Sequence, residues 1–479
     1  MTLVNRFYGV EHMIKKPMRL GEIPTTKKAY QDVIHIALPS VAEMVLMALI
    51  GSVDTMMVGV IGSEAIAAVG ITSQPRMLML AIFFALNIGV TAIVARRKGE
   101  GRQEDANRTM RNALGLIVIL SIVLGALGST FSEWMMRLAG GNTDTPADAL
   151  VLKDATVYFR LMAYALPINA ITMCISAAQR GIGNTKITMY VNITSNLVNV
   201  VFNYLLINGN LGFPKLGVEG AAIATIIGFM VGLVLALLSI MMRRNRAGFL
   251  HVSLKDDWCF DKETIRSISG VGGNALLEQI ALRIGFFLYA KMIYDALGPA
   301  AFSSHQICMQ FLNISFTFGD GIGVAGTSLV GQMLGKGRSD LSMVYGKVSQ
   351  RMALTVSAAL LLVFIPFRYP LVELFVRPEE ADVLQMAAQV MILVGIFQPF
   401  QTSSVVLSGC LRGAGDTRYV AAVMMTCVMI IRPVLSWAAI YPLQLGLVGA
   451  WTASLMDMIV RLVFVFTRFT RGKWMKIRI

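Results

Sequence analysis

The chain has 479 residues, of which 56% are hydrophobic and only 15% are charged, and its 42 Lys and Arg residues exceed its 28 Asp and Glu residues to give a net charge of +14. Ordinary soluble domains carry about 25% charged residues, so this composition excludes a soluble enzyme, a disordered chain and a small disulfide-rich domain. A mean hydropathy of +0.65 instead predicts an all-α polytopic membrane protein, because helices satisfy their own backbone hydrogen bonds in lipid.

Long apolar runs predict twelve transmembrane helices, since each span needs about 20 mostly apolar residues. The runs lie near 37–61, 65–95, 112–133, 157–179, 188–207, 217–242, 268–297, 301–332, 352–372, 383–410, 419–441 and 445–466. The predicted parts are a tail 1–36, an amino-terminal lobe 37–242, a linker 243–266, a carboxy-terminal lobe 267–466 and a tail 467–479.

The basic residues orient these helices. Both tails and every second loop together hold 31 of the 42 Lys and Arg residues, whereas the opposite loops hold 5. The positive-inside rule therefore predicts that both termini are cytoplasmic, in a bacterial cytoplasmic (inner) membrane. Basic residues spread over all inner loops fit anionic lipid headgroups and argue against a nucleic-acid partner.

The sequence repeats itself with a nearly constant offset. Three matched pairs show this: Arg180–Thr185 with Arg412–Thr417, Gly99–Arg102 with Gly335–Arg338, and Leu216–Ala221 with Leu445–Ala450. Their offsets are 232, 236 and 229 residues. Two six-helix halves inserted the same way round predict a pseudo-twofold axis along the membrane normal, and two lobes around a central cleft favour an alternating-access carrier.

Two carboxylates lie inside the first predicted helix, at Glu43 and Asp54. Ionisable groups within a span are costly and usually functional. Eleven residues correspond to about three helical turns, so both carboxylates are expected on one helix face. The alternative for each is a structural hydrogen bond to a neighbouring helix.

The predicted helix 188–207 carries a stripe of four amides, Asn192, Asn196, Asn199 and Asn203, at spacings of three or four residues. Such a stripe can simply join helices. Amide and carboxylate oxygens are also hard ligands that suit Na⁺, and a desolvated Asp could carry a proton instead. The residues leave Na⁺ and H⁺ open.

Further polar stripes fit the wall of a water-filled cleft, with helix packing as the alternative. They comprise Gln306, Gln310, Asn313, Thr317 and Asp320; Asn169, Thr172, Ser176 and Gln179; and Gln401, Ser404 and Ser408. The charges of Glu278 and Arg283 lie within one predicted span, which indicates either a buried network of charged groups or a second ion site. Asp457 and Arg461, four residues apart on one helix, are expected to pair. Met47 belongs to a methionine-rich first helix, and Met is typical both of adaptable binding sites and of gap-filling.

No enzyme chemistry emerges from the sequence. The five cysteines are far apart and His305 has no neighbouring Cys, His or carboxylate cluster at metal spacing. Gly321–Gly326 matches GxGxxG, but it lies within a span and follows no strand, so its glycines are expected to permit close helix contact. We predict no cofactor other than a coupling cation.

Several segments resemble the multidrug and toxic compound extrusion (MATE) family. They are Val53–Gly59, the two Arg-Gly-x-Gly-(Asn/Asp)-Thr turns, Asn199-x-x-x-Asn203 and Gly217–Thr225. The resemblance covers about 35–470, and the regions Arg283–Gly285 and Ser304–Gln306 are most similar to the DinF-like branch. It implies a V-shaped, monomeric exporter with two six-helix lobes that exchanges a drug-like substrate for Na⁺ or H⁺.

The same resemblance implies a cation site at Asp54, Asn199, Asn203 and Thr225. Some family members have an acidic residue where Asn203 stands, which leaves Asp54 as the main charge of the site. Arg283 and Gln401 stand where the NorM-like branch has acidic residues, which puts a second cation site in doubt.

We therefore expect a cation-coupled antiporter that exports amphiphilic or cationic small molecules, drug-like or natural products. The alternatives are a dedicated exporter of one biosynthetic product, such as a genotoxin precursor, and a lipid-linked glycan flippase. The candidate cavity and coupling residues are Glu43, Met47, Asn169, Asn196, Glu278, Arg283, Gln306, Gln310, Asn313, Asp320 and Gln401.

Overall fold

The computed structural model describes residues 7–141, 143, 145–241, 249–253, 255–376 and 380–477. Parts of all five predicted segments lie outside these residues: 1–6 of the first tail, 142, 144 and 242 of the amino-terminal lobe, 243–248 and 254 of the linker, 377–379 of the carboxy-terminal lobe, and 478–479 of the last tail.

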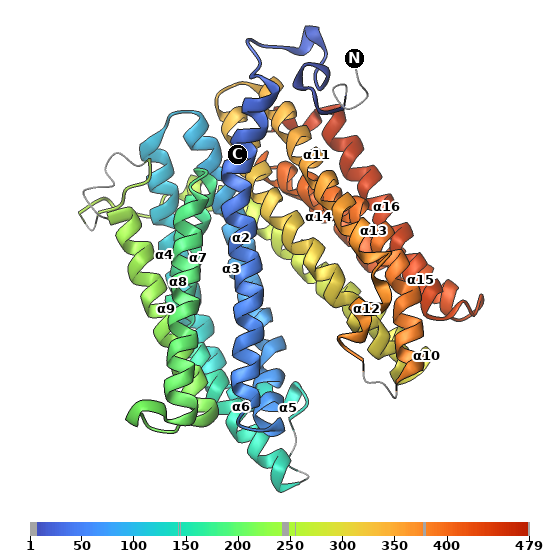
Figure 1. The fold of residues 1–479 in the computed structure, drawn as a ribbon. Helices are drawn as coiled ribbons and strands as arrows, with labels where there is room; N and C mark the ends of the chain where they lie inside the picture. The colour runs from blue at the N-terminus through green and yellow to red at the C-terminus, as the bar shows by residue number, and fades with distance from the viewer. Residues whose placement is uncertain are drawn as a thin grey trace. The chain divides into compact units, whose positions relative to one another are not determined.

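All regular structure in the described residues is helical (Figure 1). The α-helices are α2 (Thr26–Gly59), α3 (Ser63–Gly99), α4 (Gln103–Thr130), α5 (Ser132–Leu138), α6 (Pro146–Tyr164), α7 (Leu166–Gly181), α8 (Thr185–Asn208), α9 (Gly217–Met241), α10 (Lys262–Gly335), α11 (Ser339–Phe364), α12 (Arg368–Glu373), α13 (Ala381–Gly413), α14 (Thr417–Met424), α15 (Arg432–Ile440) and α16 (Gly446–Arg471). A π-helix, Met425–Ile431, joins α14 to α15, and short 3₁₀ turns are η1 (Val10–His12), η2 (Lys16–Met18), η3 (Asn210–Gly212) and η6 (Lys473–Lys476).

Nine helices of the described chain are long and apolar enough to cross a membrane, and the bent pair α6 and α7 counts as a tenth span. The two remaining predicted spans, 268–297 and 301–332, both lie within α10, where Gly298 has non-helical φ and ψ of 80° and −178°. Large apolar side chains such as Ile122, Val234 and Leu362 are more than half exposed. Such faces suit contact with lipid, so the prediction of an all-α polytopic membrane protein is confirmed.

Three predicted spans differ from the observed helices. The span 157–179 is not one straight helix, because α6 and α7 meet at a 50° bend beside Pro167, where no backbone N–H is available. The span 419–441 contains the π-helical segment, which apolar periodicity does not reveal. The first helix begins at Thr26, eleven residues before the apolar run, because a helix continues through polar sequence once it has formed.

The described residues form two compact units. One contains 7–41, Gly99–Gly101 and 273–477, and the other contains 42–98 and 102–272 with the gaps given above. The main chain therefore passes from one unit to the other inside α2 and inside α10, and it also enters the first unit briefly at Gly99–Gly101.

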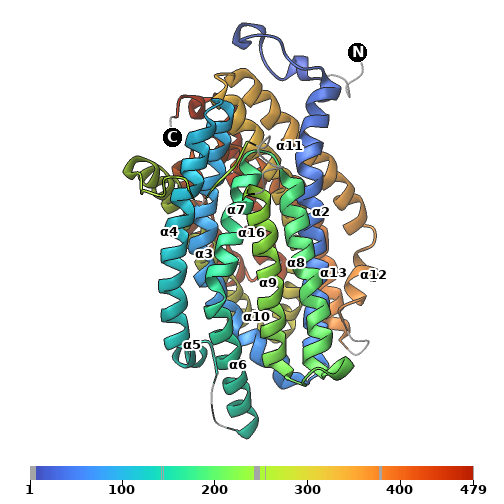
Figure 2. The same ribbon diagram turned by 90° about the vertical axis from the view of Figure 1, so that its left-hand side faces the viewer.

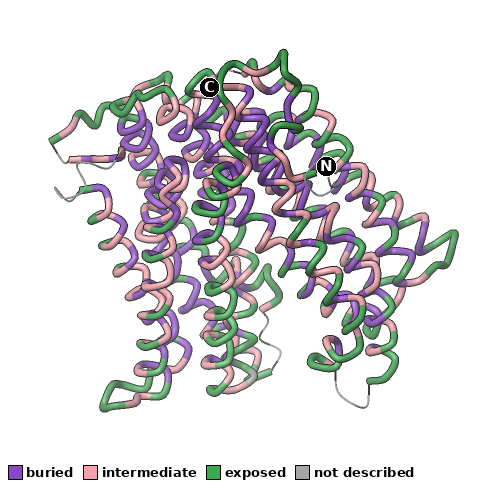
Figure 3. Tube along the Cα trace, turned by 45° about the horizontal axis from the view of Figure 1, so that its top comes forward, coloured by how far each residue is buried: buried purple, intermediate pink, exposed green. Residues whose placement is uncertain are grey.

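The unit that contains Asp54 is a layered helix bundle. In Figure 2, α4, α7, α9 and α8 lie side by side, and α4–α7, α7–α9 and α8–α9 are packed pairs. Buried apolar residues around Tyr158, Met162 and Ile207 form one core, and Met136, Leu152 and Phe159 belong to another. In Figure 3 buried and exposed residues alternate along the helices, whereas many loop residues are exposed.

The other unit is built around α13, which packs against α11 and α16. Gly321 of α10 approaches Val41 of α2 so closely that a Cβ would lie 2.9 Å from the Val41 Cα, which confirms the expected close helix contact. The predicted pair Asp457–Arg461 is also confirmed, with a 3.0 Å contact.

The repeated Arg-Gly-x-Gly turns have the same geometry in both halves. Gly183 and Gly415 have φ of 79° and 87°, a left-handed conformation that favours glycine. In each turn the next amide bonds back across the helix end, from Asn184 to the Gln179 carbonyl and from Asp416 to the Leu411 carbonyl, both at 2.9 Å.

The first glycine of each turn permits close helix packing, and its replacement should destabilise the fold. A Cβ at Gly413 would lie 2.2 Å from the Thr327 carbonyl oxygen. We expect Gly413→Ala to cost about 1–3 kcal/mol or more through overpacking, seen as a lower thermal midpoint in detergent. Gly273→Ala is the matched control, since its Cβ would meet nothing within 4 Å; equal midpoints for both variants would contradict the packing role.

Candidate functional site

Both carboxylates of α2 face α8. Glu43 accepts a 2.6 Å bond from Asn192 Nδ2, and Asp54 accepts a bond from Asn203 Nδ2. Each donor follows its acceptor by 149 residues, so α2 and α8 run side by side in the same direction. The predicted placement of both carboxylates on one helix face is thereby confirmed.

The four residues predicted as a cation site form one hydrogen-bonded chain across three helices. Beyond Asp54, the Asn203 Nδ2 group is 3.4 Å from Asn199 Oδ1. Asn199 Nδ2 in turn donates to Thr225 Oγ1 at 3.1 Å, and Thr225 donates to the Ala221 carbonyl of α9. A change at the carboxylate of α2 therefore reaches α8 and α9 directly.

A pocket of about 240 Å³ opens beside these four hydrogen-bonded residues. It is lined by Asp54, Arg76, Leu80, Tyr158, Met162, Leu166, Asn169, Ser195, Asn196, Asn199, Thr225 and Phe229. The candidates Asn169 and Asn196 thus share one cavity with Asp54, and Asn192 instead binds Glu43.

Two of the lining residues that were not singled out from the sequence interact with the polar groups of the site. Arg76 of α3 acts electrostatically on Asp54, and Tyr158 of α6 interacts with both Arg76 and Thr225. The buried Arg76 Nε has no hydrogen-bond partner in the described chain. An arginine within the run 65–95 was a signal for such a site, because charges inside a span usually have a function. Tyr158 gives no comparable signal, since tyrosines are common in helix cores.

The site has the donor chemistry of a monovalent cation site. Asn203 is fully buried, and its Oδ1 has no hydrogen-bond partner among the described residues. A buried acceptor without a partner is costly, and a cation beside Asp54 would satisfy it. Among the described residues no group of three or more His, Cys, Asp or Glu side chains is placed so that it could hold a metal ion, so the donor set does not resemble a transition-metal centre.

Glu43 lies apart from this pocket. It is 2% exposed, accepts bonds from Thr188 at 3.1 Å and Asn192 at 2.6 Å, and lies 3.8 Å from Arg180. A carboxylate with this many partners is already satisfied. Met47, also on α2, is 40% exposed and is not among the pocket residues.

The carboxy-terminal candidates belong to the other unit, and none of them lines the pocket beside Asp54. Glu278 is buried and pairs with Arg412 at 3.1 Å, not with Arg283. Gln401 is fully buried, and neither of its amide atoms has a hydrogen-bond partner within the described residues. The remaining candidates are exposed along α10: Arg283, Gln306, Gln310, Asn313 and Asp320.

A buried charge cluster distinguishes this second unit. Asp457 Oδ2 accepts bonds from Arg432 Nη2 at 2.8 Å and from Arg461 Nη2 at 3.0 Å. Arg432 also lies over the ring of Phe286, 4.9 Å from its centroid. Arg432, which lies within the predicted span 419–441, is therefore paired with Asp457.

Comparison with known proteins gives consistent relatives. The MatE family model matches 39–205 and 275–438. A probable multidrug resistance protein NorM of Thermotoga maritima is 27% identical over 464 residues, covering 97% of this chain and 96% of its own. The multidrug resistance protein MdtK of Edwardsiella ictaluri is 23% identical over 398 residues, covering 81% and 82%.

Solved structures share the fold. An outward-facing multidrug resistance MATE family transporter of the MOP superfamily has a TM-score of 0.86 at 19% identity, and a MOP superfamily transporter of Pyrococcus furiosus has 0.85 at 20%. Both comparisons cover 94% of this chain and 97% of the other. Since the family model matches well over half of the residues, with one segment in each half, this chain belongs to the MatE family of membrane transporters.

Proposed function

We propose that the protein is an antiporter that exports amphiphilic or cationic small molecules in exchange for Na⁺ or H⁺. The observation that carries this proposal is the Asp54–Asn203–Asn199–Thr225 chain beside a pocket of about 240 Å³. The relatives described as multidrug resistance proteins support the substrate class.

The pocket lining suits an amphiphilic substrate. Phe229, Met162 and Leu80 offer apolar surface, whereas Asp54 and the pocket amides offer hydrogen-bonding groups. Ligand sites typically combine such an apolar wall with a few placed polar groups. Met adds an adaptable, polarisable surface, which suits substrates of varied shape.

Coupling follows from competition for one carboxylate. A cation or proton bound at Asp54 competes for the carboxylate oxygen that accepts the hydrogen bond from Asn203 Nδ2. Asn203 is in turn linked through Asn199 to Thr225 of α9. An ion that binds here and a substrate that needs the free carboxylate favour different states, which is the thermodynamic requirement for exchange. Asp54 therefore takes the coupling role, with Asn203, Asn199 and Thr225 as its relay.

The test is efflux of ethidium from drug-sensitive bacteria that express the protein. We expect faster efflux than from cells with an empty vector, and a loss of efflux when the ion gradient is removed. Replacing external Na⁺ by K⁺ at constant pH identifies Na⁺ coupling, and a protonophore in Na⁺-free medium identifies H⁺ coupling. Failure to move ethidium and several other dyes, by protein present in the membrane, would overturn the multidrug assignment and favour a dedicated exporter.

A further inference from the structure

The chain segments before α2 and before α10 are equivalent in the internal repeat. α2 begins at Thr26 and α10 at Lys262, which is the 236-residue offset that also relates Gly99–Arg102 to Gly335–Arg338. We call residues 7–25 the amino-terminal strap and the described residues of 249–261 the central strap. Both lie on the Lys/Arg-rich side predicted to be cytoplasmic.

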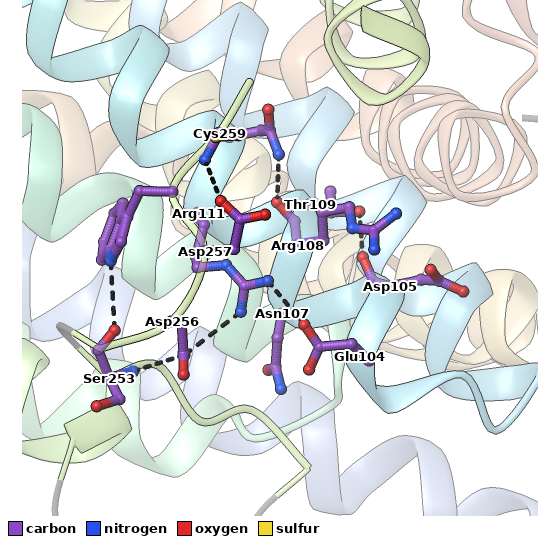
Figure 4. Close-up of polar contacts among 12 residues, drawn as sticks. Glu104, Asp105, Asn107, Arg108, Thr109, Arg111, Ser253, Asp256, Asp257 and Cys259 are labelled. Atoms are coloured by element: carbon purple, nitrogen blue, oxygen red, sulfur yellow. Dashed lines mark hydrogen bonds and ion pairs between the residues drawn. The ribbon is translucent and has the colours of Figure 1, made fainter. Parts of the chain in front are cut away.

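The central strap is docked along α4. The amides of His251 and Asp261 donate to the side-chain oxygens of Asn107 and Asn112, at 3.0 and 2.8 Å. Arg111 is only 5% exposed and bonds to Asp256 of the strap at 3.4 Å and to Glu104 at 2.7 Å, as Figure 4 shows.

Apolar contacts complete this docking. Leu250 and Val252 of the central strap are 2% and 3% exposed. The Phe260 ring lies against α4 at Gly115, where a Cβ would be 2.8 Å from the ring. The central strap is therefore held by packing and by hydrogen bonds at three successive points.

The amino-terminal strap is docked along α11 in a similar way. Lys347 Nζ donates to the Met13 carbonyl at 2.6 Å, and Asp340 accepts the Leu20 amide at 3.0 Å. Arg338 Nη2 donates to the Glu22 carbonyl at 2.9 Å. Val10, Met13 and Ile14 are buried in the same apolar core as Trp474.

The fastening residues are themselves equivalent in the repeat. Arg111 and Lys347 differ by 236 residues, as do Glu104 and Asp340 and the helices that carry them. In each unit a long cation of α4 or α11 thus bonds to the strap at the equivalent position of the repeat. The central strap precedes the second half of the repeat but lies in the same unit as α4 of the first half, and α10, which follows it, continues into the other unit. The amino-terminal strap likewise shares a unit with α11 of the second half, and α2 continues into the other unit.

We infer that Arg111 and Lys347 are positioning residues that fasten two reciprocal straps, and that transport requires both straps to stay docked. This inference rests on the proposed transport function. α2 and α10, the helices that follow the straps, each divide their length between the two units, and Asp54 lies on α2. A docked strap holds the first turns of its helix, so a displacement at the cation site moves the helix about that held end.

Residues that permit bending lie next to both crossing points. Pro39 is inside α2, two residues before the change of unit at Val41. Gly272 and Gly273 span the change of unit in α10. Proline and glycine are the usual sites of helix bends, so each strapped helix has a place to flex between its held end and the rest of its length.

The fastening is tested by labelling a cysteine buried under each strap. Val252→Cys and Val10→Cys, each in a Cys259→Ser background, place reporters at positions that are 3% and 0% exposed. We expect Arg111→Met to raise labelling of Val252→Cys by a membrane-impermeant maleimide roughly tenfold, because a buried charged hydrogen bond is lost. Lys347→Met should do the same only at Val10→Cys.

Arg108→Met is the comparison for charge. The exposed Arg108 lies on the same helix and acts electrostatically on Asp257 and Asp261 of the strap, but among the described residues its side chain forms no hydrogen bond or salt bridge with the strap. Lys336→Met, at an exposed lysine in the turn before α11, serves as the comparison for Lys347→Met. Equal labelling after Arg111→Met and Arg108→Met, in protein that elutes as a single folded species, would overturn the fastening. Labelling needs no substrate, so this arm remains decisive even if the proposed transport function fails.

The positioning role is tested by dye transport in vesicles. We expect Arg111→Met and Lys347→Met to lower the turnover several-fold with an unchanged substrate KM, since neither residue lines the substrate pocket. The exchanged variants Arg111→Lys and Lys347→Arg, in which each position receives the residue of its counterpart, should restore both turnover and slow labelling. Increased labelling, which reports release of a strap, together with unchanged turnover would show that the strap has a purely structural role and would overturn the inference.

Discussion

Asp54→Asn is expected to reduce cation-dependent efflux to the level of cells without the protein. The substitution keeps the side-chain volume and an oxygen that can still accept the bond from Asn203. It removes the negative charge that would hold Na⁺ and the group that would take up a proton. Because the neighbouring Asn199 and Thr225 are neutral, no other residue of the hydrogen-bonded chain can replace that charge.

The substitution should not unfold the protein. Asp54 forms no salt bridge with another described residue, and its neighbours keep their bonds to one another. The measurement is ethidium efflux with equal membrane expression and an equal thermal midpoint in detergent. Ion-dependent efflux by a folded Asp54→Asn protein would contradict the coupling role.

Glu43→Gln is the matched comparison, because Glu43 lies on the same face of the same helix and binds α8 in the same register. Glu43 does not line the pocket. We therefore expect its amide variant to retain ion-dependent efflux, with stability lowered by the weaker contact to Arg180. Equal loss in both variants would indicate that the whole α2–α8 contact, and not one cation site, carries coupling.

Asp457→Asn is expected to give the largest loss of stability among single substitutions that keep side-chain volume. Asp457 is fully buried between Arg432 and Arg461, which are 2% and 3% exposed. Removing the carboxylate leaves two guanidinium groups buried without a counter-ion. Breaking a buried ion pair in this way costs about 3–5 kcal/mol.

The comparison is Arg461→Met, which leaves the bond between Arg432 and Asp457 intact. It also lowers the charge of the cluster from net positive to neutral, so we expect a small effect on stability. The measurement is the thermal midpoint of each purified variant in the same detergent, which ranks the two variants by stability. A midpoint for Arg461→Met at or below that for Asp457→Asn would show that Asp457 is not the centre of the cluster.

Much of the fold was accessible from the sequence. Apolar runs located the spans, and the repeated glycine turns revealed the two halves, because Gly183 and Gly415 adopt left-handed conformations that favour glycine. The bend between α6 and α7 and the π-helix before Arg432 were not predicted. Apolar periodicity is insensitive to one extra residue in a turn when every face of the helix is apolar.

The candidate site was predicted in part. The eleven-residue spacing on α2 and the amide stripe on α8 indicated two facing surfaces, and Asp54 and Asn203 meet there. Arg76 and Tyr158, from α3 and α6, join them only through packing. Glu278 pairs with Arg412, which is 134 residues away, rather than with the nearby Arg283.

The sequence by itself determined the membrane class, the duplication and the polar faces of individual helices, because these depend on composition and on the helical period. Tertiary structure alone decided which polar faces share a cavity and which charges neutralise one another. It also decided that the segment before each half's first helix docks on the other half's helix, through Arg111 and Lys347. Such contacts join residues more than a hundred positions apart, and periodicity within one helix carries no information about its neighbour.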